Sequence, residues 1–292
     1  PVMAALPGSL RATAEVTERR VNGQPVFTLT PRTGASDWHI VYTHGGAYIH
    51  ALLPAHWAIV AELMRVTGAS VTVPIYPLAP EHRYRATYAL LEQVYRDLLE
   101  RVPAGRILLA GDSAGGGLAL GQALRWRDLG LPLPRRLLLF APWVDLTLAN
   151  PAARALEPFD VMLGVDGAVQ AGAWWAGGED PRQPLLSPLY ADLRGLPPLE
   201  VFQGTADLLL PDSTELVRRV QAAGSEARLH LTDGGFHVFM GATFLPEARE
   251  VFRKVAALTA TPERAAPRGW LTEARSALTQ VIGHLAARRG EY

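Results

Sequence analysis

The chain has 292 residues, 49% of them hydrophobic and 19% charged, and its formal net charge at pH 7 is zero. This composition is typical of a protein with a large core, and the balanced charge argues against a nucleic-acid-binding protein. The absence of cysteine excludes disulfides, thiolate nucleophiles and cysteine-ligated metals.

Membrane insertion and secretion are not expected from the apolar pattern. No run approaches eighteen apolar residues, so we expect no membrane span. The first residues lack a basic region ahead of an apolar stretch, so no signal peptide is visible. We therefore expect a cytoplasmic protein.

The first half of the chain alternates between predicted strands and helices. The opening strands are joined by Asn22-Gly23, a pair typical of tight hairpins. Strands are predicted at 13–20, 25–30, 39–44, 70–76 and 106–111, and helices at 55–67, 83–101 and 115–128.

The same alternation continues in the second half, with strands predicted at 135–142, 199–204 and 227–232 and helices at 212–223, 245–260 and 270–288. Most of these strands are apolar throughout, as in a parallel sheet buried on both faces. The fold class is therefore α/β. We expect one domain over 1–292, with a mostly parallel sheet of about eight strands and helices on both faces.

One interval interrupts the alternation. Residues 144–196 contain no predicted strand, many prolines and glycines, and a helical stretch near 166–177. An insertion of this length is usually functional, and we expect a small cap at about 150–180.

A glycine cluster follows the strand at 106–111. Gly111-Asp112-Ser113-Ala114-Gly115 matches G-x-S-x-G between a strand and a helix, which is the setting of a nucleophile elbow. A P-loop would need a lysine after the glycines, and a dinucleotide-binding turn would need glycine in place of Ser113, so both phosphate-binding hypotheses fail. A glycine-rich turn with an incidental serine is the remaining alternative.

A second glycine pair follows the strand at 39–44, in "HGGAY" (44–48). Backbone amides of Gly45 and Gly46, together with that of Ala114, are predicted to form an oxyanion hole. Ala47 keeps its N–H, so it can supply a further donor if the backbone angles there allow a Cβ. We expect His44 to order this loop, and Asp112 to anchor the serine turn by accepting hydrogen bonds.

Six segments in order resemble the hormone-sensitive-lipase-like family (bacterial family IV) of α/β-hydrolase esterases. The resemblance covers roughly 13–258. It implies Ser113 as nucleophile, Asp207 as acid and His237 as base, no cofactor, and small carboxylic esters with short to medium acyl chains as substrates. The segments are "HGGAY", "YPLAPEHRY" (76–84), "GDSAGGG" (111–117), "PWVDLT" (142–147), "SPLYADLRGLPPLEVFQGTADLL" (187–209) and "GFHVF" (235–239).

The positions of the acid and base support this assignment independently. Asp207 and His237 each follow a predicted strand, and the order Ser…Asp…His is that of α/β-hydrolases. For Asp233 a local turn role is expected. Surface or packing roles are expected for His50, His56 and His82, and no acidic or histidine cluster has metal-ligand spacing.

Apolar side chains near these motifs are expected to line an open substrate site. The predicted set is Tyr48, Trp143, Phe159, Val161, Trp174, Trp175, Leu208, Phe236 and Phe239. The alternative for each of them is core packing.

The tail extends beyond the family pattern. Apolar residues recur at helical spacing over 268–289, and we expect this extra helix to pack on the body or on a second subunit, the latter giving a homodimer.

Two other functions remain open. The same triad could hydrolyse an activated amide such as an arylformamide. A non-catalytic small-molecule-binding relative is the third hypothesis, which the presence of His237 disfavours.

Overall fold

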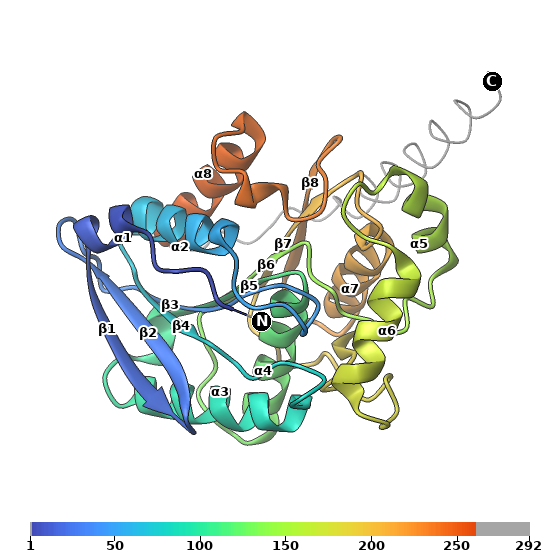
Figure 1. Ribbon diagram of the computed structural model, residues 1–292, viewed down its shortest axis with the longest axis horizontal. Coiled ribbons are helices and arrows are strands. Elements are labelled where there is room, and N and C mark those ends of the chain that lie inside the picture. The colour runs from blue at the N-terminus through green and yellow to red at the C-terminus, as the bar shows by residue number, and fades with distance from the viewer. Residues whose placement is uncertain (1, 261–292) are drawn as a thin grey trace.

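A computed structural model describes residues 2–260 of the chain (Figure 1). The strands are β1 Ala14–Val21, β2 Gln24–Pro31, β3 His39–Thr43, β4 Ser70–Pro74, β5 Ile107–Asp112, β6 Arg136–Phe140, β7 Leu199–Gly204 and β8 Ala227–Thr232. The helices are α1 Gly8–Thr13, α2 Pro54–Thr67, α3 Tyr84–Leu99, α4 Ala114–Asp128, α5 Pro151–Leu156, α6 Val165–Ala176, α7 Leu210–Ala222 and α8 Pro246–Ala260. The expected helix at 268–289, and the dimer expected through it, lie outside the described residues.

The strands form one sheet in the order β1-β2-β4-β3-β5-β6-β7-β8. The β1–β2 hairpin is antiparallel and β2 pairs antiparallel with β4, whereas the pairs from β4 to β8 are parallel. This confirms the predicted eight-stranded, mostly parallel sheet.

The apolar runs of the strands are explained by helices on both faces. Leu108 and Ala110 of β5 pack into a core with α2 and α8, while Ile107 and Leu109 pack into a second core with α3, α4 and α7. Figure 1 shows α2 and α8 on one side of the sheet and α3 and α4 on the other. Since alternate side chains of a strand point to opposite faces, a strand covered on both sides must be apolar throughout.

The parallel strands end at one edge of the sheet, where open α/β sheets bind ligands. Loops that follow β3, β5, β7 and β8 bring together residues that are far apart in the sequence. The segments after these strands include the predicted "HGGAY" loop, Ser113, Asp207 and His237. This edge therefore positions the candidate site.

Between β6 and β7 the chain folds as α5, a 3₁₀ turn at Glu157–Phe159, and α6. The structure places no strand within 144–196, in agreement with the sequence prediction. The sequence prediction missed α1 and α5, which have six residues each, because so short a helix shows less than two turns of apolar periodicity.

Within residues 2–260, no helix combines the length and the apolar character that crossing a membrane requires.

Candidate active site

Ser113 lies at the tight turn between β5 and α4. Its backbone has φ +51° and ψ −122°, a conformation that non-glycine residues rarely adopt and that is concentrated at functional sites. Its N–H donates to Phe140 O at 2.9 Å and its C=O accepts from Trp143 N at 2.8 Å. The turn is thereby held by the neighbouring strand β6 and the loop after it.

Gly115 allows α4 to approach the end of β3. A Cβ added at Gly115 would lie 2.1 Å from Thr43 O and 2.4 Å from His44 O. Gly111 is equally confined, since its Cβ would lie 2.3 Å from Gly115 O. These glycines are required by close backbone approach rather than by an unusual φ.

Replacing Gly115 by alanine is expected to destabilise the fold by about 3 kcal/mol, because the new methyl would overlap backbone atoms that cannot rotate away. Urea denaturation measures the loss. Gly105→Ala is the matched control, since its Cβ would meet no atom within 4 Å. Equal unfolding midpoints for the two variants would contradict the prediction.

The structure brings Ser113, His237 and Asp207 into one hydrogen-bonded chain. The Ser113 hydroxyl lies 2.8 Å from His237 Nε2, and His237 Nδ1 lies 2.9 Å from Asp207 Oδ2. A carboxylate can only accept, so Nδ1–H donates to Asp207 and Nε2 accepts the serine proton. The side chains of the pair are buried, at 5% exposure for His237 and 0% for Asp207.

Asp207 is itself fixed by two further donors. Leu209 N–H donates to its Oδ1 at 2.9 Å, and Gln203 Nε2 donates to its Oδ2 at 2.7 Å. The Gln203 amide is in turn held by the Ser213 hydroxyl, which donates to Gln203 Oε1 at 2.8 Å. The carboxylate therefore has one orientation toward the histidine.

The environment of His237 stabilises its protonated form. Burial lowers the pKa of His237, but the carboxylates of Asp207, Asp160 and Asp112 raise that pKa by more, so the net shift is above the ordinary value of 6.5. A base of this kind is suited to accept a proton from serine near neutral pH.

The structure contradicts the prediction that the Gly45 amide belongs to the oxyanion hole. Gly45 N–H donates to Asp112 Oδ1 at 3.0 Å, so it is already satisfied by a buried carboxylate. Gly46 and Ala47 line the cavity instead. Among residues 2–260, no acceptor is bonded to the amides of Gly46, Ala47 or Ala114.

The backbone of this loop explains which amides are available. Gly46 has φ +112° and Ala47 φ +52°, so successive N–H groups turn away from Asp112. Ile49 N–H and His50 N–H both donate to Gly46 O, at 3.0 and 2.8 Å, and close the turn. Within the described part of the chain, Gly46 and Ala47, rather than Gly45, therefore have backbone amides free of a partner beside the cavity.

Asp112 joins the serine turn to this loop, as expected for an anchoring carboxylate. Besides Gly45 N–H, its Oδ1 accepts from Tyr42 Oη at 2.5 Å, and its Oδ2 lies 3.4 Å from His56 Nε2. His56 Nδ1 accepts from Leu53 N–H at 2.8 Å, so Nε2 carries the proton that faces Asp112. This role of His56 was not predicted from the sequence, since its partner Asp112 is 56 positions away along the chain.

His44 orders the loop, in line with its expected role. Its Nδ1 donates to Gly45 O at 2.6 Å, and its ring stacks on Tyr76 at 4.4 Å between centroids. The Tyr76 hydroxyl donates to His44 O at 2.7 Å. Burial lowers the pKa of His44 to about 4, so its ring is neutral near pH 7.

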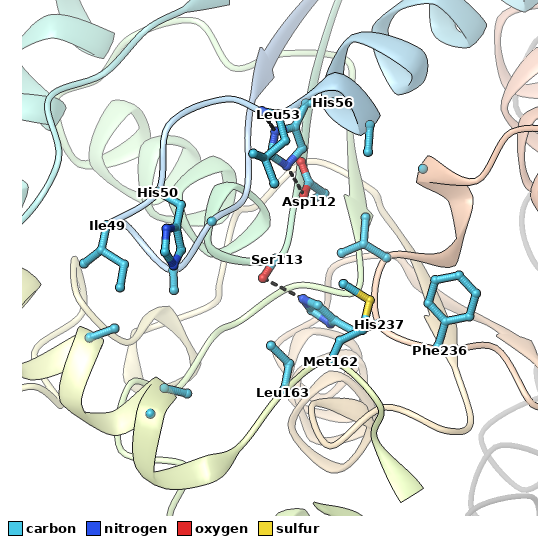
Figure 2. A pocket seen from close by; sticks show the side chains of 18 of the residues that line it. Ile49, His50, Leu53, His56, Asp112, Ser113, Met162, Leu163, Phe236 and His237 are labelled. Carbon is cyan, nitrogen blue, oxygen red and sulfur yellow. Dashed lines mark hydrogen bonds and ion pairs between the residues drawn. The ribbon is translucent and has the colours of Figure 1, made fainter. Parts of the chain in front are cut away.

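A cavity of about 720 Å³ opens over Ser113 and His237 (Figure 2). Aliphatic and small side chains make up most of its wall. It is lined by Gly46, Ala47, Ile49, His50, Leu53, Ala55, His56, Asp112, Ser113, Met162, Leu163, Gly164, Gly167, Ala168, Ala171, Phe236, His237, Val238, Gly241, Ala242 and Phe244.

Of the nine predicted lining side chains, all within the described residues, Phe236 is the one that lines this cavity. Tyr48 stacks on Trp175 at 4.4 Å and on Trp143 at 5.6 Å between centroids, and all three are buried in the core. Leu208 is buried in the same core as these three rings, and Phe239 is buried in the core that contains α2 and α8.

The other predicted residues do not line the cavity. Trp174 is 45% exposed and Val161 is 81% exposed, while Phe159 is half-buried outside the lining. Large rings gain more from core packing than from a solvent-filled pocket, and neighbouring residues on a helix point about 100° apart. Trp175 therefore faces the core and Trp174 the solvent.

Small residues at the start of α6 form one wall instead. Gly164, Gly167, Ala168 and Ala171 follow a spacing of three and four residues and so share a helix face. That spacing is readable in the sequence, and it is the signal that could have identified this wall.

Comparisons with known proteins agree with this geometry. Residues 40–241 match a family described as having the alpha/beta hydrolase fold. The chain is 34% identical over 221 residues to an esterase of Acinetobacter venetianus, covering 74% of this chain and 73% of that protein. It is 33% identical to an acetyl-hydrolase of Streptomyces hygroscopicus, covering 77% of this chain and 76% of that protein.

A solved structure of an esterase from the bacterial hormone-sensitive lipase family superimposes with a TM-score of 0.81 at 32% identity, covering 85% of this chain and 84% of that one. The chain therefore belongs to the α/β-hydrolase fold family, among the hormone-sensitive-lipase-like esterases.

Proposed function

We propose that the chain is a serine carboxylesterase that hydrolyses short- to medium-chain esters through an acyl-enzyme. The observation that carries the proposal is the buried relay from Ser113 through His237 to Asp207, with contacts of 2.8 and 2.9 Å, at the floor of an apolar cavity. The names of the relatives, esterase and acetyl-hydrolase, support the same chemistry.

In the proposed mechanism His237 takes the Ser113 proton as the oxygen attacks the ester carbonyl. Asp207 holds the imidazole in the required tautomer and stabilises the imidazolium that forms. His237 then protonates the leaving alcohol, and water repeats the sequence on the acyl-enzyme.

Three backbone amides are proposed to hold the oxyanion. They belong to Gly46, Ala47 and Ala114, in place of the set with Gly45. Each such donor typically lowers the barrier by about 3–4 kcal/mol. The Asp112 carboxylate supports them indirectly, since it holds the loop through Gly45 N–H.

The cavity has two sides that separate the two halves of an ester. Ile49 and Ala168 pack against the hydrophobic core that contains Trp175, whereas Phe236 and Val238 pack against the core that contains α2 and α8. In Figure 2, Ile49 lies on the opposite side of Ser113 from Phe236, and His237 lies beside Phe236. The leaving oxygen must reach His237 Nε2, so the acyl chain extends toward Ile49 and α6.

The helices α5 and α6, within the interval 150–180, are proposed to act as the small cap. Met162, Leu163 and α6 contribute to the cavity wall, and a wall that excludes water strengthens the electrostatic interactions at the serine.

Gly167→Leu is expected to shorten the acyl chain that the enzyme accepts. Gly167 lines the cavity and its Cβ would meet no atom within 4 Å, so a leucine side chain enters open space rather than clashing. We expect the ratio of kcat/KM for p-nitrophenyl octanoate to that for the acetate to fall about tenfold or more.

Ala173→Leu is the matched control on the exposed face of the same helix, and its ratio should equal that of the wild type. If Gly167→Leu also leaves the ratio unchanged, the α6 wall does not contact the acyl chain. A change with the size of the alcohol instead would reverse the assignment of the two sides.

The proposed function is tested with p-nitrophenyl esters of increasing acyl length and with a fluorophosphonate that labels activated serines. Turnover of the short esters and labelling that is lost in Ser113→Ala support it. Faster hydrolysis of an arylformamide than of any ester would favour the amidase, and absence of both turnover and labelling would favour a binding protein.

A further inference from the structure

Asp160 lies between the 3₁₀ turn Glu157–Phe159 and α6, in the segment proposed as the cap. Its Oδ1 accepts from the N–H groups of Met162 and Leu163 at 2.8 and 2.9 Å. Its Oδ2 accepts from Leu208 N–H at 2.9 Å. One carboxylate thus bonds its own turn and a backbone amide 48 positions away from Asp160.

The two segments that Asp160 joins both belong to the active site. Met162 and Leu163 line the cavity, and Leu208 directly follows Asp207, the partner of His237. Leu208 is fully buried, so water cannot replace Asp160 as the acceptor for its amide without rearrangement. The position of the loop that carries Asp207 therefore depends on a side chain of the cap segment.

Resting on the proposed esterase function, we propose that Asp160 is a positioning residue for the base. Its hydrogen bonds fix the position of the Asp207 loop relative to the cavity wall. Its negative charge stabilises the protonated imidazole of His237. Asp160 does not line the cavity, and its hydrogen bonds go to Met162, Leu163 and Leu208, so its effect is transmitted through Leu208 and through space.

The charges around His237 define the expected pH effect. Three carboxylates act on His237: Asp207 in the loop after β7, Asp112 at the end of β5, and Asp160 in the cap segment. Two further histidines lie nearby. His56 on α2 contacts Asp112, and His50 lines the cavity. Against the lowering effect of burial, Asp207 raises the pKa of His237, followed by Asp160 and Asp112. Removal of the Asp160 charge should lower that pKa.

The test is the pH profile of kcat/KM for p-nitrophenyl acetate in the wild type and in Asp160→Asn. Activity needs neutral His237, so the wild-type rate should fall as the pH drops through a midpoint above 6.5. In Asp160→Asn this midpoint should move down by about 0.5 pH unit. The plateau value of kcat/KM should also fall, because one amide group cannot accept from all three N–H donors.

A second variant separates the charge from the hydrogen bonds. Asp160→Glu keeps the charge but displaces the oxygens, so its plateau should fall while its acid midpoint stays near that of the wild type. Asp180→Asn is the matched control. Asp180 is exposed and its Oδ1 accepts from Arg182 N–H at 2.9 Å in a similar turn, so neither the plateau nor the midpoint should change.

An NMR titration of the His237 ring in ¹⁵N-histidine-labelled protein measures the same pKa without turnover. If the wild type hydrolyses no ester, the proposed function fails while this titration still tests Asp160. Equal His237 midpoints in the wild type and Asp160→Asn, by rate or by NMR, would overturn the proposal. So would a plateau that Asp160→Asn and Asp160→Glu both leave unchanged.

Discussion

Ser113→Ala is expected to lower kcat for p-nitrophenyl butyrate by about 10⁴–10⁶-fold and to change KM little. The substitution removes the only oxygen that lies within hydrogen-bonding distance of His237 Nε2 among residues 2–260. The oxyanion amides and the cavity remain, and they account for the residual rate. Alanine is small enough for the turn that the serine occupies at φ +51°.

The measurement compares initial rates and unfolding midpoints of the two proteins. A loss of rate with an unchanged midpoint assigns the effect to chemistry rather than to folding. If the variant retains more than about one hundredth of the wild-type kcat, Ser113 is not the nucleophile. In that case the labelled residue must be identified by peptide mapping of the fluorophosphonate adduct.

Asp207→Asn is expected to lower kcat by about 10⁴-fold. Two donors and the histidine converge on the carboxylate of Asp207: Leu209 N–H, Gln203 Nε2 and His237 Nδ1–H. An asparagine can accept through one oxygen alone, so its NH₂ group must face at least one of these donors. If it faces His237 Nδ1, the ring proton moves to Nε2, which can then no longer accept the serine proton.

Asp233→Asn is the control for this prediction, because Asp233 is close to His237 in sequence but bonds the Thr205 hydroxyl at 3.2 Å. Its kcat should stay within about threefold of the wild type. A comparable loss in both variants would indicate that the loop, rather than the Asp207 carboxylate, is responsible. A loss confined to Asp233→Asn would exchange the roles of the two residues.

Much of the fold could be predicted from local patterns. The largely apolar sequence of strands such as 107–112 and 199–204 indicates that both of their faces are buried. The glycines around Ser113 indicate a turn with no room for side chains. The family resemblance implied the acid and the base, and their positions supported it, because each follows a strand and parallel strands end at a common edge. Predicting buried strands, the serine turn and residues at strand ends requires only local sequence and the general geometry of a parallel sheet.

The oxyanion loop shows where such inference stops. "HGGA" offers three consecutive amides, and no local pattern indicates which of them face the cavity. The buried carboxylate of Asp112, 67 positions along the chain from Gly45, accepts the Gly45 N–H, so that amide does not face the cavity. Backbone angles at Gly46 and Ala47 then direct the next two amides elsewhere.

The cavity wall shows the same limit for side chains. Aromatic residues near the motifs were natural candidates for a substrate site, yet Tyr48, Trp143 and Trp175 stack with one another in the core. An apolar side chain gains free energy from leaving water whether it meets a ligand or a neighbour, so hydrophobicity alone cannot distinguish lining from packing. The space of the cavity is left open by the small residues of α6, whose side chains are too short to fill it.

The positions of most strands along the chain and the serine turn could thus be inferred from the linear chain, because each depends on local spacing. The three relay residues were assigned by the family resemblance and supported by their places after strands that share one sheet edge, whereas the order of the strands in the sheet came from the structure. Pairings across long stretches of chain, such as Asp112 with Gly45 and His56 or Asp160 with Leu208, are decided in the folded protein alone. Such contacts require two backbones to meet at hydrogen-bonding distance, and that distance is a property of the packed sheet and cap rather than of either segment.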